Sequence, residues 1–257
     1  MKKDARLDDI VKICERDGIT TIGMLAEKMQ VSEITIRRDL KLLESLKLIR
    51  KYKKGYAVAD TKHAYDVSSY HIDRELQVHA EKKRDIGIKA ASLIKKGETV
   101  IFDCGSTILH MVQALPERAP IRAVCYGLNV ATALQKKQVQ QLIVFGGVYH
   151  DEMDTFEGLS ETDEIRYVRA QKAFLSAFGI HKQAGLTSGS FFMSSMRKKI
   201  ISSSEVVVLL ADSSKFGVIE CAHFADLSTP HLYVTDRDIS AEYREILENL
   251  NKTLIVV

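Results

Sequence analysis

The sequence predicts a small winged helix-turn-helix domain over residues 1–58, followed by a larger α/β domain with a parallel sheet over residues 79–257. Three observations support this division. Apolar residues at helical spacing and a pair of short strands fill the first 58 residues, and a polar stretch of mixed charge over residues 59–78 is typical of a linker. Beyond it, runs of Val, Ile and Leu alternate with helical segments, as in sheets covered by helices on both faces.

Composition sets the broad class. With 257 residues, 46% hydrophobic and 28% charged, the chain can bury a substantial core, and it is predicted to be globular. Its apolar runs are too short to span a bilayer, and the opening segment MKKDARLDD has no apolar core of a signal peptide, so we expect a cytoplasmic protein with no membrane partner. The cysteines are too scattered to predict a disulfide framework or a structural zinc site; they are Cys14, Cys104, Cys125 and Cys221.

Positive charge is concentrated in the segment VSEITIRRDLKLLESLKLIRKYKKGY, residues 31–56. Residues 1–60 hold nine Lys and five Arg against six Asp and four Glu, a net charge of +4, so the formal total of +3 leaves −1 for the rest. Within residues 37–54, eight cations stand beside two acids, a net charge of +6. We therefore expect the first domain to bind a partner of high negative charge density, such as nucleic acid.

The first domain contains three predicted helices. The first covers residues 7–14, the second follows Thr21 as its N-cap, and the third follows a short turn in which Ser32 is the N-cap. Apolar residues of the third helix fall at i, i+4 and i+7 on one face; they are Ile36, Leu40 and Leu43. After it, KLIRKY and GYAV predict a β-hairpin wing with Lys53 and Lys54 at its tip.

The opposite face of the third helix has the composition of a major-groove reader. Arg can form two hydrogen bonds to guanine, Lys and Thr can reach phosphates, and an aliphatic side chain can meet a thymine methyl group. A solvated charged face on a protein-binding module is the alternative, but the short turn and the clustered cations favour double-stranded DNA. The residues expected to contact DNA are Ser32, Ile34, Thr35, Arg37, Arg38, Lys41, Lys53 and Lys54.

The larger domain is expected to begin with a helix over residues 81–95 and to continue as alternating strands and helices. Strands are predicted in TVIFDC, IRAVCY, QLIVFGG, KAFLSAFG, VVVLLAD, HLYVTD and TLIVV, and helices in ILHMVQAL, LNVATALQKK and AEYREILENL. Ligands of such sheets bind where strands end and helices begin. The loops at these junctions are therefore the candidate ligand sites.

The junction FDCGSTILHMV is the most informative of these loops. A strand ends at Asp103 and a helix starts near Thr107, so that Gly105 allows a tight turn and the amides of Gly105, Ser106 and Thr107 can face an anion. On this loop alone, a phosphate site and an ordinary capped turn are equally well supported.

Other strand ends carry polar residues as well. LLADSSKFG places Asp212 and Lys215 where a carboxylate could accept from sugar hydroxyls and a cation could meet an anion, and FGGVYHDE places Gly146 and Gly147 at another strand end. His150 with the two acids that follow it, residues 151 and 152, suggests a metal, but no second histidine lies at ligand spacing, so we expect neither a metal nor a cofactor.

Two sets of motifs resemble a known family. VSEITIRRDLKLLE resembles the helix-turn-helix signature of the DeoR-type bacterial repressors, which control sugar and nucleoside catabolism. FDCGST, FGG, KAFLSAFGI, GLT and DSSKFG resemble successive motifs of the family's sensor domain, whose fold is similar to ribose-5-phosphate isomerase. The chain departs from the family at the wing, which reads RKYKKGY in place of a His-Gly-Gly-like tip, and at Gln171, where the family often has Asp.

The resemblance implies a transcriptional repressor, and not an enzyme, that is released from its operator by a phosphorylated sugar. AVCYGLN, FDCGST and the GG…H loop are most similar to regulators of deoxyribonucleoside operons, which implies deoxyribose 5-phosphate as the effector. The residues carried over by the resemblance are Asp103, Gly105, Ser106, Thr107 and Lys215. Because helix-turn-helix proteins usually read two half-sites, a homodimer or higher homo-oligomer is expected.

One alternative of another class is an isomerase-like enzyme with an appended DNA-binding domain. Isomerisation of a sugar phosphate needs a positioned base, and the segment GIHKQAGLTSGSFF, which corresponds to the isomerase's catalytic region, offers no carboxylate. The repressor is therefore the favoured interpretation.

Overall fold

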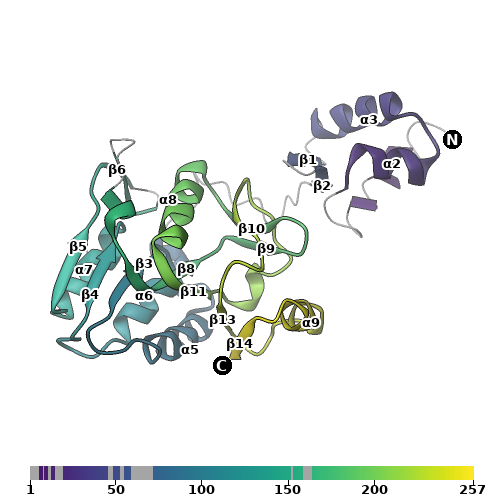
Figure 1. Cartoon of the computed structure of the whole chain (residues 1–257). Coiled ribbons are helices and arrows are strands. Elements are labelled where there is room, and N and C mark those ends of the chain that lie inside the picture. The colour runs from purple at the N-terminus through teal and green to yellow at the C-terminus, as the bar shows by residue number, and fades with distance from the viewer. Residues whose placement is uncertain are drawn as a thin grey trace. The chain divides into compact units, whose positions relative to one another are not determined.

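The computed structural model describes residues 6–7, 9–10, 13–14, 20–45, 49–52, 55–58, 72–151, 153–158 and 164–257 of the chain. It forms two compact units, Met1–Ala64 and Tyr65–Val257, each with its own core (Figure 1). The predicted linker over residues 59–78 lies outside the described residues up to residue 71, and part of the rest forms helix α4, Ile72–Gln77.

The smaller unit is a winged helix-turn-helix. Helix α2, Ile22–Met29, is capped by the Thr21 hydroxyl, which accepts from the Met24 amide at 3.2 Å. Helix α3, Glu33–Ser45, starts after Ser32, whose hydroxyl accepts from the Thr35 amide at 3.3 Å, as the sequence predicts. Strands β1, Ile49–Tyr52, and β2, Gly55–Val58, pair antiparallel as the wing.

The core of this unit confirms the predicted apolar face of the third helix. Its buried members are Ile10, Cys14, Leu25, Ile36, Leu40, Leu43 and Ile49. A contact not predicted from the sequence ties the wing to the chain before α2, because Thr20 and Tyr56 exchange two backbone hydrogen bonds of 2.8 and 2.7 Å. Lys53 and Lys54, at the expected tip, lie outside the described residues.

The larger unit is built on a seven-stranded sheet in which every neighbouring pair is parallel. The order is β14-β13-β11-β8-β3-β4-β5. The strands are β3 Thr99–Phe102, β4 Arg122–Cys125, β5 Gln141–Val144, β8 Ala170–Ser176, β11 Ser204–Leu210, β13 Leu232–Thr235 and β14 Thr253–Val256. All seven overlap the predicted segments, β8 and β11 beginning two residues earlier than predicted, and the parallel α/β architecture is confirmed.

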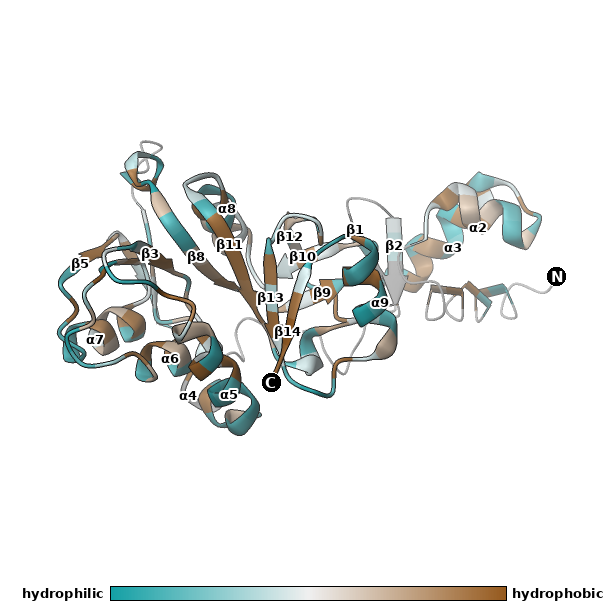
Figure 2. Ribbon diagram, turned by 60° about the horizontal axis from the view of Figure 1, so that its bottom comes forward, coloured by the Kyte–Doolittle hydropathy of each residue, from teal (hydrophilic) through white to brown (hydrophobic). Residues whose placement is uncertain are grey.

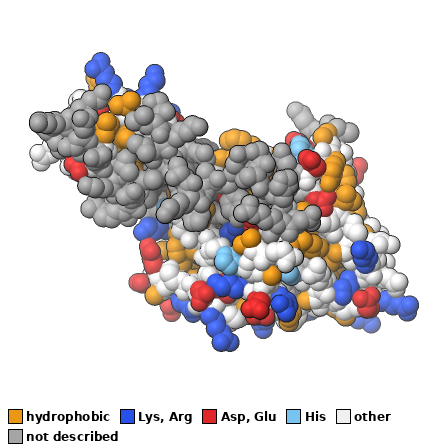
Figure 3. All heavy atoms as spheres, turned by 180° about the vertical axis from the view of Figure 1, so that it is seen from behind, with side chains coloured by type: hydrophobic (Ala, Val, Ile, Leu, Met, Phe, Trp, Pro, Cys, Tyr) orange, Lys and Arg blue, Asp and Glu red, His pale blue; other side chains and the backbone are white. Residues whose placement is uncertain are grey.

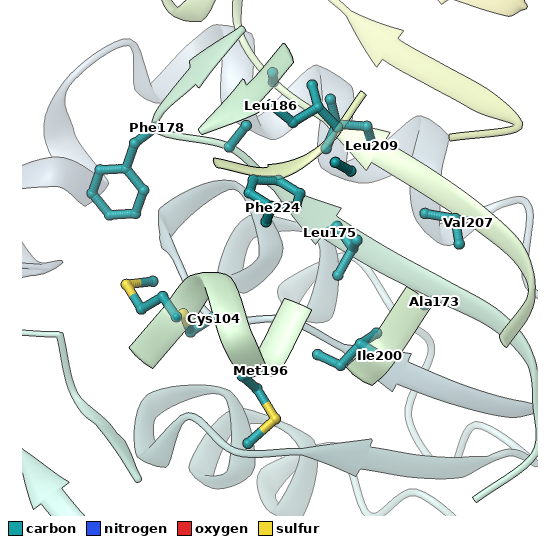
Figure 4. Close-up of a cluster of buried hydrophobic side chains, with 14 of the residues drawn as sticks. Cys104, Ala173, Leu175, Phe178, Leu186, Met196, Ile200, Val207, Leu209 and Phe224 are labelled. Carbon is teal, nitrogen blue, oxygen red and sulfur yellow. The ribbon is translucent and has the colours of Figure 1, made fainter. Parts of the chain in front are cut away.

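Helices cover both faces of this sheet. One face packs against α5 Ala80–Ala91, α6 Ser106–Gln113 and α7 Leu128–Lys136, and the other against α8 Phe191–Ser202 and α9 Ala241–Asn249. Strand β11 shows why its run of apolar residues has no polar alternation, because Val207 and Leu209 enter one core and Val208 and Leu210 the other. Figure 2 shows the hydrophobic strands between amphipathic helices. In Figure 4, side chains of α8 face strand β8 in the core between them. On the surface of the larger unit, Figure 3 shows cationic and acidic side chains interspersed on one face.

Several elements were not predicted from the sequence. They are α4, α8, the hairpin of β6 Val148–His150 and β7 Thr155–Glu157, the short helices η2 Glu164–Tyr167 and η3 Ser213–Lys215, and a three-stranded antiparallel sheet, β12-β10-β9. The strands of this second sheet are β9 Gly179–His181, β10 Gly185–Ser188 and β12 Ala222–Ala225.

The order of the strands creates a switch point in the middle of the sheet. The chain starts at β3, moves outward through β4 to the edge strand β5, and then returns to the other side of β3 as β8. The crossovers that follow β3 and β8 therefore leave in opposite directions. Open sheets of this kind bind ligands at such a point, beyond the carboxyl ends of the strands.

Gly87 sets the distance between helices α5 and α6. A Cβ atom built there would lie 2.7 Å from the Met111 amide nitrogen and 2.8 Å from the His110 carbonyl carbon. Gly87→Ala gains about 1 kcal/mol in helix propensity, but overpacking against backbone costs about 1–3 kcal/mol. We expect a net loss of unfolding free energy in urea titrations. Gly23→Ala in α2, whose nearest contact would be 3.8 Å, is the control. Unchanged or higher stability of Gly87→Ala would contradict the close approach.

Candidate functional site

The outward face of α3 exposes most of the residues expected to contact DNA. Arg37, Arg38, Lys41 and Ser32 are exposed, and the Ile34 side chain is 68% exposed at the first turn of the helix. Thr35 is half-buried, and its hydroxyl lies 3.0 Å from that of Ser32. The cations and the aliphatic group therefore share one accessible surface.

An acid within the cationic segment is turned away from this surface. Asp39 is buried, and its carboxylate accepts hydrogen bonds from Arg6 Nε at 2.5 Å and Nη2 at 3.2 Å. The ion pair fastens the first helical segment to α3 and neutralises Asp39 within the unit. Glu33 remains exposed and pairs with Arg37 at 3.3 Å. Consequently, Arg38 and Lys41 stand on a face that is more positive than the sequence count suggests.

The larger unit contains a pocket at the switch point of its sheet. The loops after β3, β8 and β11 line it, together with side chains from α4 and α5. Its polar lining comes from Gly105, Ser106, Thr107, Ser176, Lys83, Lys215 and Glu75. The structure thus brings together four of the eight residues expected to bind an effector, namely Gly105, Ser106, Thr107 and Lys215.

The turn after β3 presents the start of helix α6 to this pocket. Gly105 has φ +112° and precedes the first residue of α6, and a Cβ atom there would lie 3.1 Å from Ser176 Oγ. The first amides of a helix have no partner within it, and they carry the positive end of the helix dipole. An anion in the pocket can therefore be bound by the first turn of α6.

Two lysines add positive charge to the pocket. Lys215 reaches it from η3, and Lys83 reaches it from α5 with only 2% of its side chain exposed. The Lys83 ammonium donates to the Glu75 carbonyl oxygen at 2.6 Å and lies 3.8 Å from Glu75 Oε2. Burial lowers the pKa of Lys83 below its ordinary value, and the neighbouring charges of Asp212 and Glu75 partly oppose this shift. Neither Lys83 nor Glu75 was among the residues expected from the sequence.

Asp103 lies behind the pocket and does not line it. Its carboxylate is fully buried and accepts from the Tyr126 hydroxyl, from the Ser176 amide at 2.9 Å and hydroxyl at 3.0 Å, and from Arg197 Nε at 2.9 Å. Asp103 and Ser176 follow β3 and end β8, so this network fixes the two loops that meet at the switch point.

Arg197 is the charged centre of that network. It comes from α8, is fully buried, and its guanidinium carbon lies 5.2 Å from the Phe224 ring centre and 5.7 Å from that of Phe178. Next to the network, Cys104 Sγ lies 3.3 Å from the Tyr126 hydroxyl, and burial raises the pKa of Cys104 to about 12.

Asp212 borders the pocket at the end of β11. It is buried, and its Oδ1 accepts from the Ser214 amide at 3.1 Å and caps η3. Among the described residues, no hydrogen-bond partner is found for its other oxygen, Oδ2. Gln171, by contrast, lies at the opposite end of the sheet, where its side-chain oxygen accepts from the Thr99 amide at 2.8 Å.

Gly146 and Gly147 are not brought to the pocket, because they follow the edge strand β5. Gly147 has φ +149°, and a Cβ atom there would lie 1.8 Å from the Glu157 carbonyl oxygen, so the turn into β6 requires glycine for packing. His150 pairs with Glu157 at 2.8 Å. The described part of the chain holds no group of three His, Cys, Asp or Glu side chains suited to a metal, and residue 152 is outside it.

Each unit matches a known protein family model. Residues 6–62 match the DeoR-like helix-turn-helix domain, and residues 78–237 match the DeoR C-terminal sensor domain. The chain belongs to the DeoR family. Within the described residues of this DeoR-family protein, no helix is long and apolar enough to cross a membrane.

Characterised members of the DeoR family are similar along nearly the whole chain. The deoxyribose operon repressor of Escherichia coli K12 is 28% identical over 242 residues, 94% of each chain. The lactose phosphotransferase system repressor of Lactococcus lactis is 27% identical over 252 residues, 95% of each chain. Both are named as repressors, in agreement with the family assignment.

Solved structures similar to this DeoR-family chain include ribose 5-phosphate isomerase A from Methanocaldococcus jannaschii. The two share 15% identity and a TM-score of 0.40 over 53% of this chain and 54% of the isomerase. The eIF2B beta subunit from Chaetomium thermophilum shares 14% identity and a TM-score of 0.40 over 58% of this chain and 47% of that chain.

Proposed function

We propose that this DeoR-family protein represses a sugar or deoxyribonucleoside operon and leaves its operator when a phosphorylated sugar binds the larger unit. One observation carries the proposal. A pocket lined by two lysines and the first turn of α6 lies at the switch point of a parallel sheet, in a chain that also exposes a cationic recognition helix.

On the DNA side, α3 is proposed to enter the major groove. Arg37 and Arg38 are suited to base edges and Lys41 to phosphate, while exposed Ile34 can contact a thymine methyl group. Lys53 and Lys54 of the wing are proposed to contact the backbone of the same duplex. Since one such domain covers one half-site, a homodimer or larger homo-oligomer in the cytoplasm is the proposed acting form.

On the effector side, the phosphate is proposed to bind at Ser106, Thr107 and Lys215, with Gly105 allowing its close approach. Asp212 Oδ2, which has no hydrogen-bond partner among the residues that the structure describes, is the proposed acceptor for a sugar hydroxyl. Asp103 is proposed to act indirectly, by holding the loop. The similarity to a deoxyribose operon repressor supports deoxyribose 5-phosphate as the first effector to test.

The isomerase alternative has less support. The characterised relatives that match the whole chain carry the names of repressors. Turnover of ribose 5-phosphate or deoxyribose 5-phosphate at rates typical of enzymes would reverse this choice.

The direct test measures binding of the full chain to the DNA upstream of its own gene at one stated salt concentration. Pentose and hexose phosphates, and the same sugars without phosphate, are titrated into the complex. Loss of the complex with deoxyribose 5-phosphate alone supports the proposal in full. Loss of the complex with another sugar phosphate supports a sugar-phosphate site in the larger unit but assigns a different effector. A DNA complex that stays stable with every sugar phosphate rejects the assignment of a sugar phosphate as effector.

Lys215→Ala is expected to weaken binding of the sugar phosphate about 10- to 100-fold, because a charge-assisted contact to the phosphate is lost. Operator affinity without effector should stay as in the wild type. Calorimetry and a DNA-binding titration measure the two affinities. Lys89→Ala, an exposed lysine of α5, is the control for the loss of one charge. If DNA binding fell in parallel with effector binding, the two sites would not be separable.

A further inference from the structure

Glu75 belongs both to the pocket and to the first helix described after the smaller unit. The chain leaves that unit at Ala64, and α4 is the first element described after it. Contacts of the described residues hold α4 on the larger unit. The Lys83 ammonium donates to the Glu75 carbonyl at 2.6 Å, His110 Nε2 lies 3.3 Å from the Leu76 carbonyl oxygen, and Ile72 is buried in the core.

The pocket in this arrangement is too small for a sugar phosphate. Its volume is about 30 Å³, which is room for no more than a few water molecules. Full entry of a sugar phosphate into this enclosed space therefore requires that a lining group move. Gly105, Ser106 and Ser176 belong to loops fixed by the Asp103 network, whereas Glu75 is on a helix of six residues outside that network.

Repulsion between the Glu75 carboxylate and a bound phosphate also indicates that Glu75 is the group that moves. Among the residues that line it, the pocket combines two ammonium groups, Lys83 and Lys215, with the carboxylate of Glu75, whose side chain is 10% exposed. The buried carboxylate of Asp212 lies at its border and also acts on Lys83. A phosphate monoester brings a charge of about −1.5 to −2. Two anions in one partly buried pocket repel each other strongly, since screening by water is weak there. The carboxylate thus occupies the pocket as an internal substitute for the phosphate.

We infer that Glu75 competes with the effector's phosphate for Lys83, so that effector binding expels Glu75 and releases α4 from the larger unit. The inference rests on the proposed function of the pocket. It names Lys83 as a further contact of the phosphate. It also explains how occupancy reaches the DNA-binding unit, because α4 is where the connection from that unit joins the sensor domain.

This mechanism makes a reciprocal prediction. A ligand shifts an equilibrium only by binding one state more tightly than the other, and here the state with α4 released has the free pocket. If operator DNA favours the state with α4 bound, the DNA complex must bind effector more weakly than the free protein does. The factor must equal the one by which the effector lowers the affinity for operator DNA.

The test compares Glu75→Gln with Glu81→Gln, which removes an exposed carboxylate from the neighbouring helix α5. Calorimetry on the full chain uses deoxyribose 5-phosphate and inorganic phosphate as probes. Glu75→Gln should bind both about tenfold more tightly than the wild type, and its operator complex should dissociate at correspondingly lower effector concentration. Glu81→Gln should behave as the wild type.

A second measurement follows α4 itself. The chain has no tryptophan, so Gln77→Trp at an exposed position of α4 introduces a single fluorescent reporter. Its emission should shift when deoxyribose 5-phosphate is added and should not shift with unphosphorylated deoxyribose. In the double variant with Glu75→Gln, the shift should occur at lower concentration.

The outcomes separate the two ideas. If the wild type binds deoxyribose 5-phosphate but Glu75→Gln binds it with the same affinity, the displacement of Glu75 is overturned and the proposed function stands. The same holds if the ligand binds and the emission of Gln77→Trp does not change. A wild type that binds no sugar phosphate by calorimetry overturns the proposed function, and the displacement of Glu75 with it.

Discussion

Replacing Arg197 with Met is expected to lower the unfolding free energy of the larger unit by about 3–5 kcal/mol. The guanidinium is fully buried and pairs with the equally buried Asp103, so Met would leave a carboxylate without its counter-ion in the core. Asp103 would keep its hydrogen bonds from Ser176 and Tyr126, which compensate only part of the charge. The loops after β3 and β8 would lose the contacts with α8 that Arg197 makes to Asp103 and Ser176.

Urea unfolding of the full chain, monitored by far-UV circular dichroism, measures this loss. Lys198→Met, at the exposed neighbouring position of α8, controls for the loss of a cation and should change the unfolding free energy by less than about 0.5 kcal/mol. Adding Asp103→Asn to Arg197→Met should recover part of the stability, because no charge remains to be compensated. A loss below about 1 kcal/mol in Arg197→Met would show that the pair contributes little.

The second large effect is expected on DNA binding, in the variant that combines Arg38→Ala and Lys41→Ala. Both side chains are exposed on α3 and contribute little to the core. Loss of a base-contacting arginine costs about 1–3 kcal/mol, and loss of a phosphate contact lowers the slope of log affinity against log salt by about 1. Operator affinity should therefore fall about 100-fold or more, with a shallower salt dependence.

Affinity measured at three or more salt concentrations tests this expectation. The Arg6–Asp39 pair remains in this variant, so the thermal unfolding of the smaller unit should be unchanged. Lys89→Ala, on the larger unit, controls for net charge and should leave the operator affinity nearly unaltered. If the double variant bound the operator with wild-type affinity, α3 would not be the helix that contacts the DNA.

The strands of the larger unit could be predicted because the sheet buries both faces. β8 and β11 are largely apolar runs bounded by turn residues, and short runs of this kind are typical of strands covered on both sides. The antiparallel sheet of β9, β10 and β12 could not be predicted. Its strands are three or four residues long, and β9 and β10 begin with glycine, so their pairing depends on tertiary contacts.

The glycine-containing loop of the candidate pocket could be predicted from the sequence, but two buried cations were not predicted, Lys83 in the pocket lining and Arg197 in the network behind it. Lys83 lies three residues before buried Ile86 on α5, and Arg197 lies three residues before buried Ile200 on α8, so each cation falls on an apolar helix face. A cation in such a position is a usable signal in the sequence, because burial of a charge requires a partner. Glu75 carries no such signal, since only the fold brings α4 to the pocket.

Cys104 gives the loop after β3 a chemical property of its own. It lies between Asp103 and Gly105 and is completely buried, and the pKa of its thiol is raised to about 12. Peroxides and disulfides react with the thiolate, and almost none is present at neutral pH. The Cys104 sulfur, two residues before Ser106, is therefore a poor target for peroxides and disulfides.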